Sequence, residues 1–90
     1  MERKRSRIDI ISDMLGTILA KGGEIKPTHL MYKSNLSHGQ MQQYLKELSE
    51  KKFIQRTRRN EHEYILITDE GVKFKQKIEE MKAFEQGFAF

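Results

Sequence analysis

The first apolar residues of the chain recur at the spacing of one face of an α-helix. This stripe consists of Ile8, Ile11, Met14, Leu15, Ile18 and Leu19. Steps of three and four residues place side chains along a single helical face. Ser6 and Asp9 stand at the positions of a capping box, and Gly22 and Gly23 can adopt the left-handed backbone that ends a helix. The pattern therefore predicts a helix over residues 7–21.

The next segment predicts two helices joined by a tight turn. Residues 24–26 have room only for a short strand, and a helix over about 27–33 then begins on a proline, which suits the first helical position. Ser37 and Gln40 form a second capping box at the start of a helix over 37–52. The inward stripe of this helix consists of Met41, Tyr44, Leu45 and Leu48. Such a pair of helices is typical of a helix-turn-helix motif.

After residue 52 the pattern becomes that of a β-hairpin followed by a helix. Residues 53–58 and 62–68 are rich in β-branched and aromatic residues and flank a polar bend at 59–61. A last helix of eighteen residues is predicted over 69–86, capped by its first residue or by the threonine before it, with Gly87 as its limit. Its apolar positions are Val72, Phe74, Ile78 and Met81.

The order of these elements predicts the fold class. Helix, short strand, helix, turn, helix, β-hairpin wing and C-terminal helix is the order of a winged helix-turn-helix domain, an α+β and mainly helical fold. The chain accordingly divides into a basic flexible arm at 1–6, a winged helix-turn-helix domain at 7–68, and a C-terminal helix at 69–90. We expect the last of these to be a dimerisation element.

Positive charge is concentrated in two short segments. The formal net charge is +4 at pH 7, and residues 1–7 and 51–63 each carry +3, so the rest of the chain is slightly acidic. All six arginines lie in these two segments, whereas lysines are spread along the chain. Because arginine suits bidentate contacts with phosphate and guanine, this distribution favours nucleic acid as the partner. The alternative is that basic tails and loops only keep the protein soluble.

Three groups of residues are candidates for contacts with DNA. Placing the apolar stripe of the 37–52 helix inward leaves its other residues for a major groove, chiefly in the N-terminal half, because Glu47 and Glu50 would repel phosphates. The recognition-helix group is His38, Gly39, Gln42, Gln43 and Lys46. The wing group, for the backbone or minor groove, is Arg56, Arg58, Arg59 and Asn60. The arm group is Arg3, Lys4 and Arg5. About five to eight phosphate contacts would give a slope of log affinity against log salt of roughly −4 to −7.

The chain resembles the archaeal winged-helix family of small DNA-binding proteins. The resemblance rests on the stretch ILAKGGEIKPTHLMYKSNLSHGQMQQYLKELSEKKFI followed by YILITDEGVKF, and it covers residues 7 to about 82. The shared features are a lysine and glycine end to the first helix, a KSNLS-like turn, a tyrosine-leucine recognition helix and a strand running into T-x-x-G. The resemblance implies a double-stranded DNA-binding protein of the cytoplasm, either a transcriptional regulator or a nucleoid-associated protein, that forms homodimers through a long C-terminal coiled coil.

The last helix carries more apolar residues than so small a core needs. The dimerisation group is Phe74, Ile78, Met81 and Phe84. The spacing of its first three members fits a helix–helix seam, and we expect a two-fold dimer through the last helix, to which the first helix can contribute. The alternatives are that these side chains fold back onto the first helix, or that the domain is a protein–protein interaction module without affinity for DNA.

Several classes of function are not expected from this composition. There is no cysteine, no phosphate-binding glycine-rich loop and no second domain, so neither an enzyme nor a cofactor is predicted. His29, His38 and His62 do not recur at a metal-ligand spacing. The acidic residues Asp9 and Asp13 interrupt what would have to be the apolar part of a signal peptide. No membrane span or effector pocket is predicted, and the three tyrosines are expected in the core or at its rim.

Overall fold

The computed structural model describes residues 5–88, without the side chains of residues 86 and 88, and contains four helices and three strands. The elements are α1 (Arg7–Ala20), β1 (Glu24–Ile25), α2 (Pro27–Ser34), α3 (His38–Glu50), β2 (Ile54–Arg59), β3 (His62–Ile67) and α4 (Asp69–Phe88). This order confirms the predicted winged helix-turn-helix topology, and the bounds differ from the predicted ones by at most two residues. The last helix has 20 residues rather than eighteen.

Both predicted capping boxes are present. The Ser6 hydroxyl accepts a hydrogen bond from the backbone N–H of Asp9, whose carboxylate accepts one from the N–H of Ser6. Ser37 and Gln40 make the same pair of bonds at the start of α3. These contacts satisfy backbone donors that an α-helix leaves free in its first turn. The two serines therefore fix where α1 and α3 begin.

The first three helices end in a residue with left-handed backbone. Gly22 follows α1 with a φ of 83°, Asn35 follows α2 with 55°, and Lys52 follows the end of α3 with 64°. In each case the next residue donates its N–H to a carbonyl in the last turn, as Phe53 does to Leu48 over 2.9 Å. This is the Schellman arrangement. Because Lys52 takes the left-handed conformation, α3 ends before the predicted residue.

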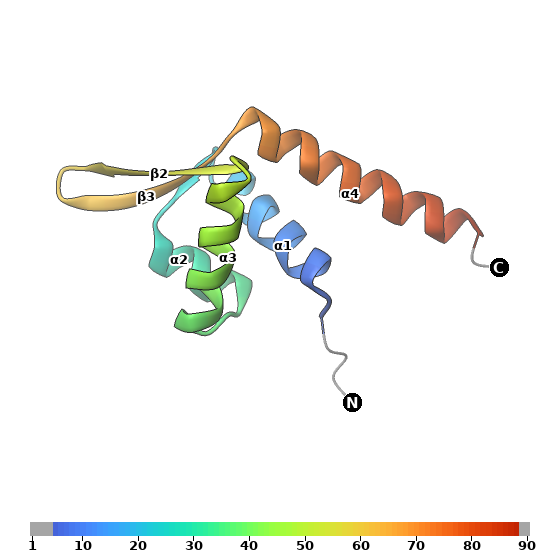
Figure 1. The fold of residues 1–90 in the computed structure, drawn as a ribbon, viewed down its shortest axis with the longest axis horizontal. Coiled ribbons are helices and arrows are strands. Elements are labelled where there is room, and N and C mark those ends of the chain that lie inside the picture. The colour runs from blue at the N-terminus through green and yellow to red at the C-terminus, as the bar shows by residue number, and fades with distance from the viewer. Residues whose placement is uncertain (1–4, 89–90) are drawn as a thin grey trace.

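The strands form one antiparallel sheet in the order β1-β3-β2. The hairpin pairs Arg59 with His62, so only Asn60 and Glu61 form the turn, with φ of 50° and 67°. Two consecutive residues with positive φ make a type I′ turn, whose twist matches that of the strands. In Figure 1 this hairpin projects from the helices as the wing.

A single hydrophobic core lies around α1. Fully buried side chains come from every helix and from the sheet, among them Met14, Leu30, Leu45 and Ile65. Helix α1 contacts α2, α4 and β3. The predicted apolar stripe of α1 is buried except at its two ends, where Ile8 is half-buried and Leu19 is 38% exposed.

Helix α4 runs back along α1 and extends away from the wing (Figure 1). Lys75 lies against Gly16, and Lys82 binds Asp9 over 2.5 Å, so the two helices are antiparallel. Ile78 faces α1 and is 2% exposed. The prediction that Ile78 contributes to a dimer seam is therefore wrong, because the core of its own chain already covers this side chain. The fold measures 52 × 32 × 22 Å, with the wing and α4 at its two ends.

Candidate nucleic-acid interface

The start of α3 presents the predicted recognition residues at the surface. His38, Gly39, Gln43 and Lys46 are exposed, and Gln42 is half-buried. The last approaches the ring of His38, with 3.5 Å between Nε2 of Gln42 and Nε2 of the histidine. Of the predicted inward stripe, Met41, Leu45 and Leu48 are buried and Tyr44 is half-buried, so these polar groups point away from the core. Their number and placement suit contacts with a groove of nucleic acid.

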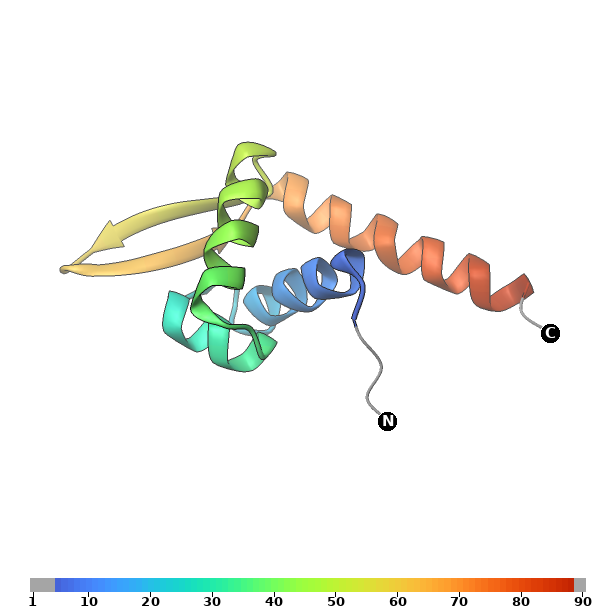
Figure 2. The same cartoon turned by 60° about the horizontal axis from the view of Figure 1, so that its bottom comes forward.

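The two basic segments flank α3 on opposite sides. In Figures 1 and 2 the wing lies on one side of this helix and the start of α1 lies on the other. A hollow of about 330 Å³ separates the wing from the helix starts; its walls include Lys26 and Thr28 near the start of α2, and His38 and Gln42 of α3. The wing closes this hollow with residues 61–63, two of which are glutamates. Carboxylates at that position disfavour a phosphate inside the hollow itself.

The wing group does not form a single cluster. Opposite residues of an antiparallel pair share a face of the sheet, and successive residues alternate. The register therefore places Arg56 and Arg58 on the face of buried Ile65, and Arg59 on the other face with Tyr64. Asn60 lies in the turn that joins β2 to β3. The sequence prediction missed this division because it treated the tip as one loop.

Two of the three wing arginines are held by carboxylates. Arg56 donates to Glu63 over 2.7 Å across the hairpin. Arg59 binds Glu24 of β1, and its guanidinium lies 4.5 Å from the centre of the Tyr64 ring. Within the described part of the chain, Arg58 is in no ion pair, and its guanidinium donates to the Glu61 carbonyl over 3.5 Å. Arg58 is thus the wing arginine best placed to take a phosphate.

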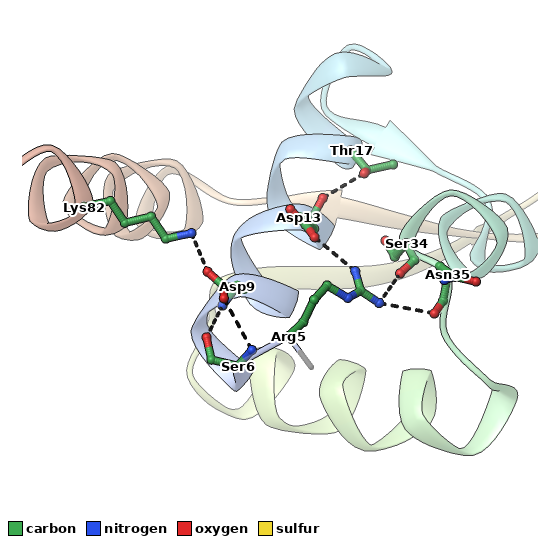
Figure 3. A network of polar contacts seen from close by, with 8 residues as sticks. All are labelled: Arg5, Ser6, Asp9, Asp13, Thr17, Ser34, Asn35 and Lys82. Carbon is green, nitrogen blue, oxygen red and sulfur yellow. Dashed lines mark hydrogen bonds and ion pairs between the residues drawn. The ribbon is translucent and has the colours of Figure 1, made fainter. Parts of the chain in front are cut away.

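Arg5 belongs to the folded domain and not to a free arm. Figure 3 shows its guanidinium between α1 and the end of α2. It donates to Asp13 over 3.0 Å and to the carbonyls of Ser34 and Asn35 over 2.8 and 3.2 Å. A cation at these carbonyls is favourable because helix ends leave acceptors unsatisfied. Arg5 therefore does not stand in a free arm, as the sequence predicted, because Asp13 and the two carbonyls already bind its guanidinium. The other two members of the arm group, Arg3 and Lys4, lie outside the described residues.

Arg7 is held in the same way beside α3. It donates to both carboxylate oxygens of Glu47, over 2.7 and 2.5 Å, and lies 5.7 Å from the centre of the Tyr44 ring. The hydrogen bond to Glu47, together with its charge, raises the pKa of Arg7 above its ordinary value. Next to this pair is a hollow of about 300 Å³ that Gln40 and Gln43 also line. The guanidinium therefore stands beside the outward face of the recognition helix.

The carboxylate partners are the functional residues that sequence reasoning missed. Glu24 and Arg59 are 35 residues apart, and Arg7 and Glu47 are 40 apart, so no local spacing connects them. Tyr44 and Tyr64 are half-buried, which confirms their predicted place at the rim. Tyr32 is 79% exposed, so its predicted place in or beside the core is wrong. Its position opposite the buried side of α2 turns the ring to solvent.

A groove with an apolar lining lies between α1, α3 and α4, and the Arg7–Glu47 pair borders it too. Its volume is about 170 Å³, and its apolar lining is Ile8, Ile11, Leu48, Phe53 and Phe74. The last two stack, with ring centroids 4.4 Å apart. Further along α4, Met81 is 54% and Phe84 is 66% exposed. Three of the four predicted dimerisation residues thus remain at or near the surface.

Two other classes of site were sought within residues 5–88. No group of three or more histidine, aspartate or glutamate side chains there is arranged to hold a metal ion. None of the helices in that range combines the length and apolar character needed to cross a bilayer.

Comparison with known proteins places the fold. A family model described as winged helix-turn-helix matches residues 4–86. No curated protein sequence matches the chain significantly. Among solved structures, the DNA-binding protein Sso10a-2 from Sulfolobus solfataricus is similar with a TM-score of 0.81 and 20% identity, over 92% of this chain and 84% of that one.

Two further structures share the architecture. A winged-helix DNA-binding protein from STIV has a TM-score of 0.75 and 16% identity, over 96% of this chain and 97% of that one. The PcaV transcriptional regulator from Streptomyces coelicolor has a TM-score of 0.76 and 15% identity, over 97% of this chain and 62% of that one. At these identities the likeness concerns the fold.

Proposed function

The chain belongs to the winged helix-turn-helix family, and from this membership we propose that it binds double-stranded DNA as a transcriptional regulator or nucleoid-associated protein. The observation that carries the proposal is the exposed polar start of α3, flanked by the wing on one side and the start of α1 on the other. The printed descriptions of two similar structures, Sso10a-2 and the STIV protein, as DNA-binding support it. With this function we propose that the protein resides where the DNA lies, in the cytoplasm of a cell without a nucleus.

In this proposal the N-terminal half of α3 enters the major groove. Gln43 can contact a base edge, and Lys46 can reach a phosphate. Glu50 is exposed near the C-terminal end of the helix and would repel the backbone there, so the helix enters by its start. Arg58 of the wing contacts the adjacent backbone or minor groove. Arg3 and Lys4 contribute from the N-terminal arm.

Ion pairing within the protein lowers the number of phosphate contacts. Arg5, Arg7, Arg56 and Arg59 all have carboxylate partners. We therefore expect about two to four contacts, and a slope of log affinity against log salt of roughly −2 to −4. This slope is shallower than the one expected from the arginine count alone.

The test is a fluorescence-anisotropy titration of labelled duplexes from low to moderate salt. One duplex has a random sequence, and the others form a set of different defined sequences. Lys46→Ala and Arg58→Ala should each weaken binding to all duplexes and reduce the magnitude of the slope by about 0.9. Lys77→Ala, an exposed lysine on α4, is the control and should change little. Gln43→Ala should matter only for a preferred sequence. Absence of binding to any duplex at low salt would contradict the proposal and favour an interaction module.

We also propose that the protein is a two-fold homodimer through α4. The support is the apolar groove beside Phe74 and the exposed Met81 and Phe84 farther along the same helix. Because exposed apolar area of this kind is stabilised by burial, a second copy of α4 is the expected cover.

Light scattering with sedimentation at increasing concentration tests the dimer. The mass should be that of two chains for the wild type and of one chain for Met81→Glu/Phe84→Glu. Gln76→Glu adds a charge at an exposed position of the same helix that is turned away from Met81, and it should leave the dimer intact. A single-chain mass for the wild type at high micromolar concentration would exclude the dimer.

A further inference from the structure

Two arginines of this protein are held in the same kind of three-residue arrangement. Each guanidinium lies over a tyrosine ring and binds a glutamate that is remote in the sequence. One set is Arg59, Tyr64 and Glu24 on the wing, and the other is Arg7, Tyr44 and Glu47 at α3. In Figure 1 the wing and the start of α1, where Arg59 and Arg7 stand in the sequence, lie on opposite sides of α3.

The wing set folds an arginine back from the tip. Arg59 borders the two-residue turn, whereas Glu24 lies on β1, opposite Leu66 of β3. The side chain reaches back along the hairpin and lies over Tyr64 on the way. Its guanidinium is therefore drawn away from the tip of the wing and from the DNA backbone that the wing is proposed to contact.

The helix set covers an arginine beside the proposed groove-binding residues. Glu47 takes two hydrogen bonds from one terminal nitrogen of Arg7. The hollow next to the pair is lined by Gln40 and Gln43. A phosphate that enters this hollow would contact the guanidinium of Arg7, which Glu47 already binds.

Both pairs are open to competition from solvent. The side chains of Arg59 and Arg7 are 52% and 66% exposed, and those of Glu24 and Glu47 are 39% and 31% exposed. A carboxylate and a phosphate can each offer arginine a pair of anionic oxygens as hydrogen-bond acceptors. Ion pairs this exposed contribute little to folding, so a phosphate can replace the carboxylate without unfolding the domain.

We propose that Glu24 and Glu47 compete with DNA phosphates for Arg59 and Arg7, and so limit the protein's sequence-independent affinity for duplex DNA. The inference rests on the proposed function. Each glutamate keeps one cation from contributing to the ionic part of binding, which is the part that does not discriminate between sequences. The tyrosines keep both guanidiniums in place, ready for whichever anion is present.

Neutralising either glutamate should therefore strengthen binding. Glu24→Gln and Glu47→Gln should each bind random duplex several-fold more tightly at moderate salt. Each should also steepen the slope of log affinity against log salt by about 0.9, the increment for one added phosphate contact. The matched controls are Glu61→Gln on the wing and Glu50→Gln on α3. In the described part of the chain neither of these carboxylates is in an ion pair, so their removal lowers repulsion without releasing an arginine.

A double-mutant cycle separates release of an arginine from loss of repulsion. In the Arg59→Ala background, Glu24→Gln should no longer tighten binding, and the same holds for Glu47→Gln in the Arg7→Ala background. Thermal melts of all variants check that each is folded. Two outcomes would overturn this inference but leave the proposed DNA binding intact. One is an equal gain in affinity with and without the arginine. The other is that the Glu→Gln variants bind random duplex no better than a wild type that does bind it. If neither the wild type nor any variant binds duplex, the proposed function fails with it.

Discussion

Gly71 lies where the base of the wing meets the first turn of α4, and there is no room for a side chain. A Cβ atom at this position would lie 2.2 Å from the carbonyl oxygen of Phe53 and 2.8 Å from the side chain of Ile67. Thr68 closes the same junction, because its hydroxyl donates to the Lys52 carbonyl and accepts from the N–H of Gly71. The T-x-x-G motif thus joins α4 to the end of α3.

We predict that Gly71→Ala destabilises the fold by about 1–3 kcal/mol, because the methyl group meets rigid backbone. Gly16→Ala is the matched control within a helix. Its Cβ would meet only the flexible end of Lys75 at 3.0 Å, and alanine favours the helix by up to about 1 kcal/mol. Urea denaturation of both variants measures the difference. Equal stability of the two would show that the junction tolerates a side chain.

Local residue patterns were enough to predict the caps but not the charge partners. Ser6 and Ser37 lie three residues from their partners, so a short motif identifies them. The partners of Arg7 and Arg59 come from other elements, and only the folded topology brings them together. The sequence therefore located the arginines in two short segments, but could not show which of them are ion-paired.

At the scale of elements, left-handed residues set the lengths of helices and the wing. Lys52 and Glu61 have positive φ although neither is glycine or asparagine. Such a conformation costs about 1–2 kcal/mol for an ordinary residue, because its Cβ crowds the following carbonyl. The tight turn and the Schellman bonds around these residues offset that cost.

We predict that Lys52→Gly raises the free energy of unfolding by about 1 kcal/mol, because glycine adopts the left-handed conformation freely. Asn35→Gly, at the equivalent position after α2, should change stability much less, since asparagine already tolerates this conformation. Thermal or urea unfolding gives both values. A gain of the same size at Asn35 would argue against relief of backbone strain at Lys52.

Element type was predictable throughout, and element ends were predictable where a cap marks them. Gly87 was expected to limit α4, yet the helix continues to Phe88. A glycine within a helix costs only about 1 kcal/mol, so its presence alone does not end the helix. The sheet order β1-β3-β2 has no local signal, because it depends on which edge the short β1 pairs with.

At the scale of the whole molecule, an ion pair in the second half of α4 holds this helix against α1. Lys82 binds Asp9 near the start of α1 (Figure 3). The hydrogen bonds from Lys82 and from Ser6 lower the pKa of Asp9 from 3.8 to about 2. Because the folded state favours the carboxylate, this pair stabilises the fold above pH 4, and that contribution is lost as the pH falls towards 2.

We predict that Asp9→Asn lowers stability at pH 5 and that the difference from the wild type shrinks steadily between pH 4 and about 2. Urea unfolding across this range measures it. Glu79→Gln, which removes the exposed partner of Lys75 on the same helix, should show a smaller effect. A difference for Asp9→Asn that stays constant down to pH 2 would contradict the role of the Lys82 pair.

The junction at Gly71 also bears on how two copies would read DNA. Its backbone contact with Phe53, the threonine bridge and the stacked rings fix the direction in which α4 leaves the wing. In a dimer through α4, the distance between the two copies of α3, one in each chain, would then be fixed. If the two half-sites of an operator are moved apart by a few base pairs, only one subunit of the dimer should bind at a time.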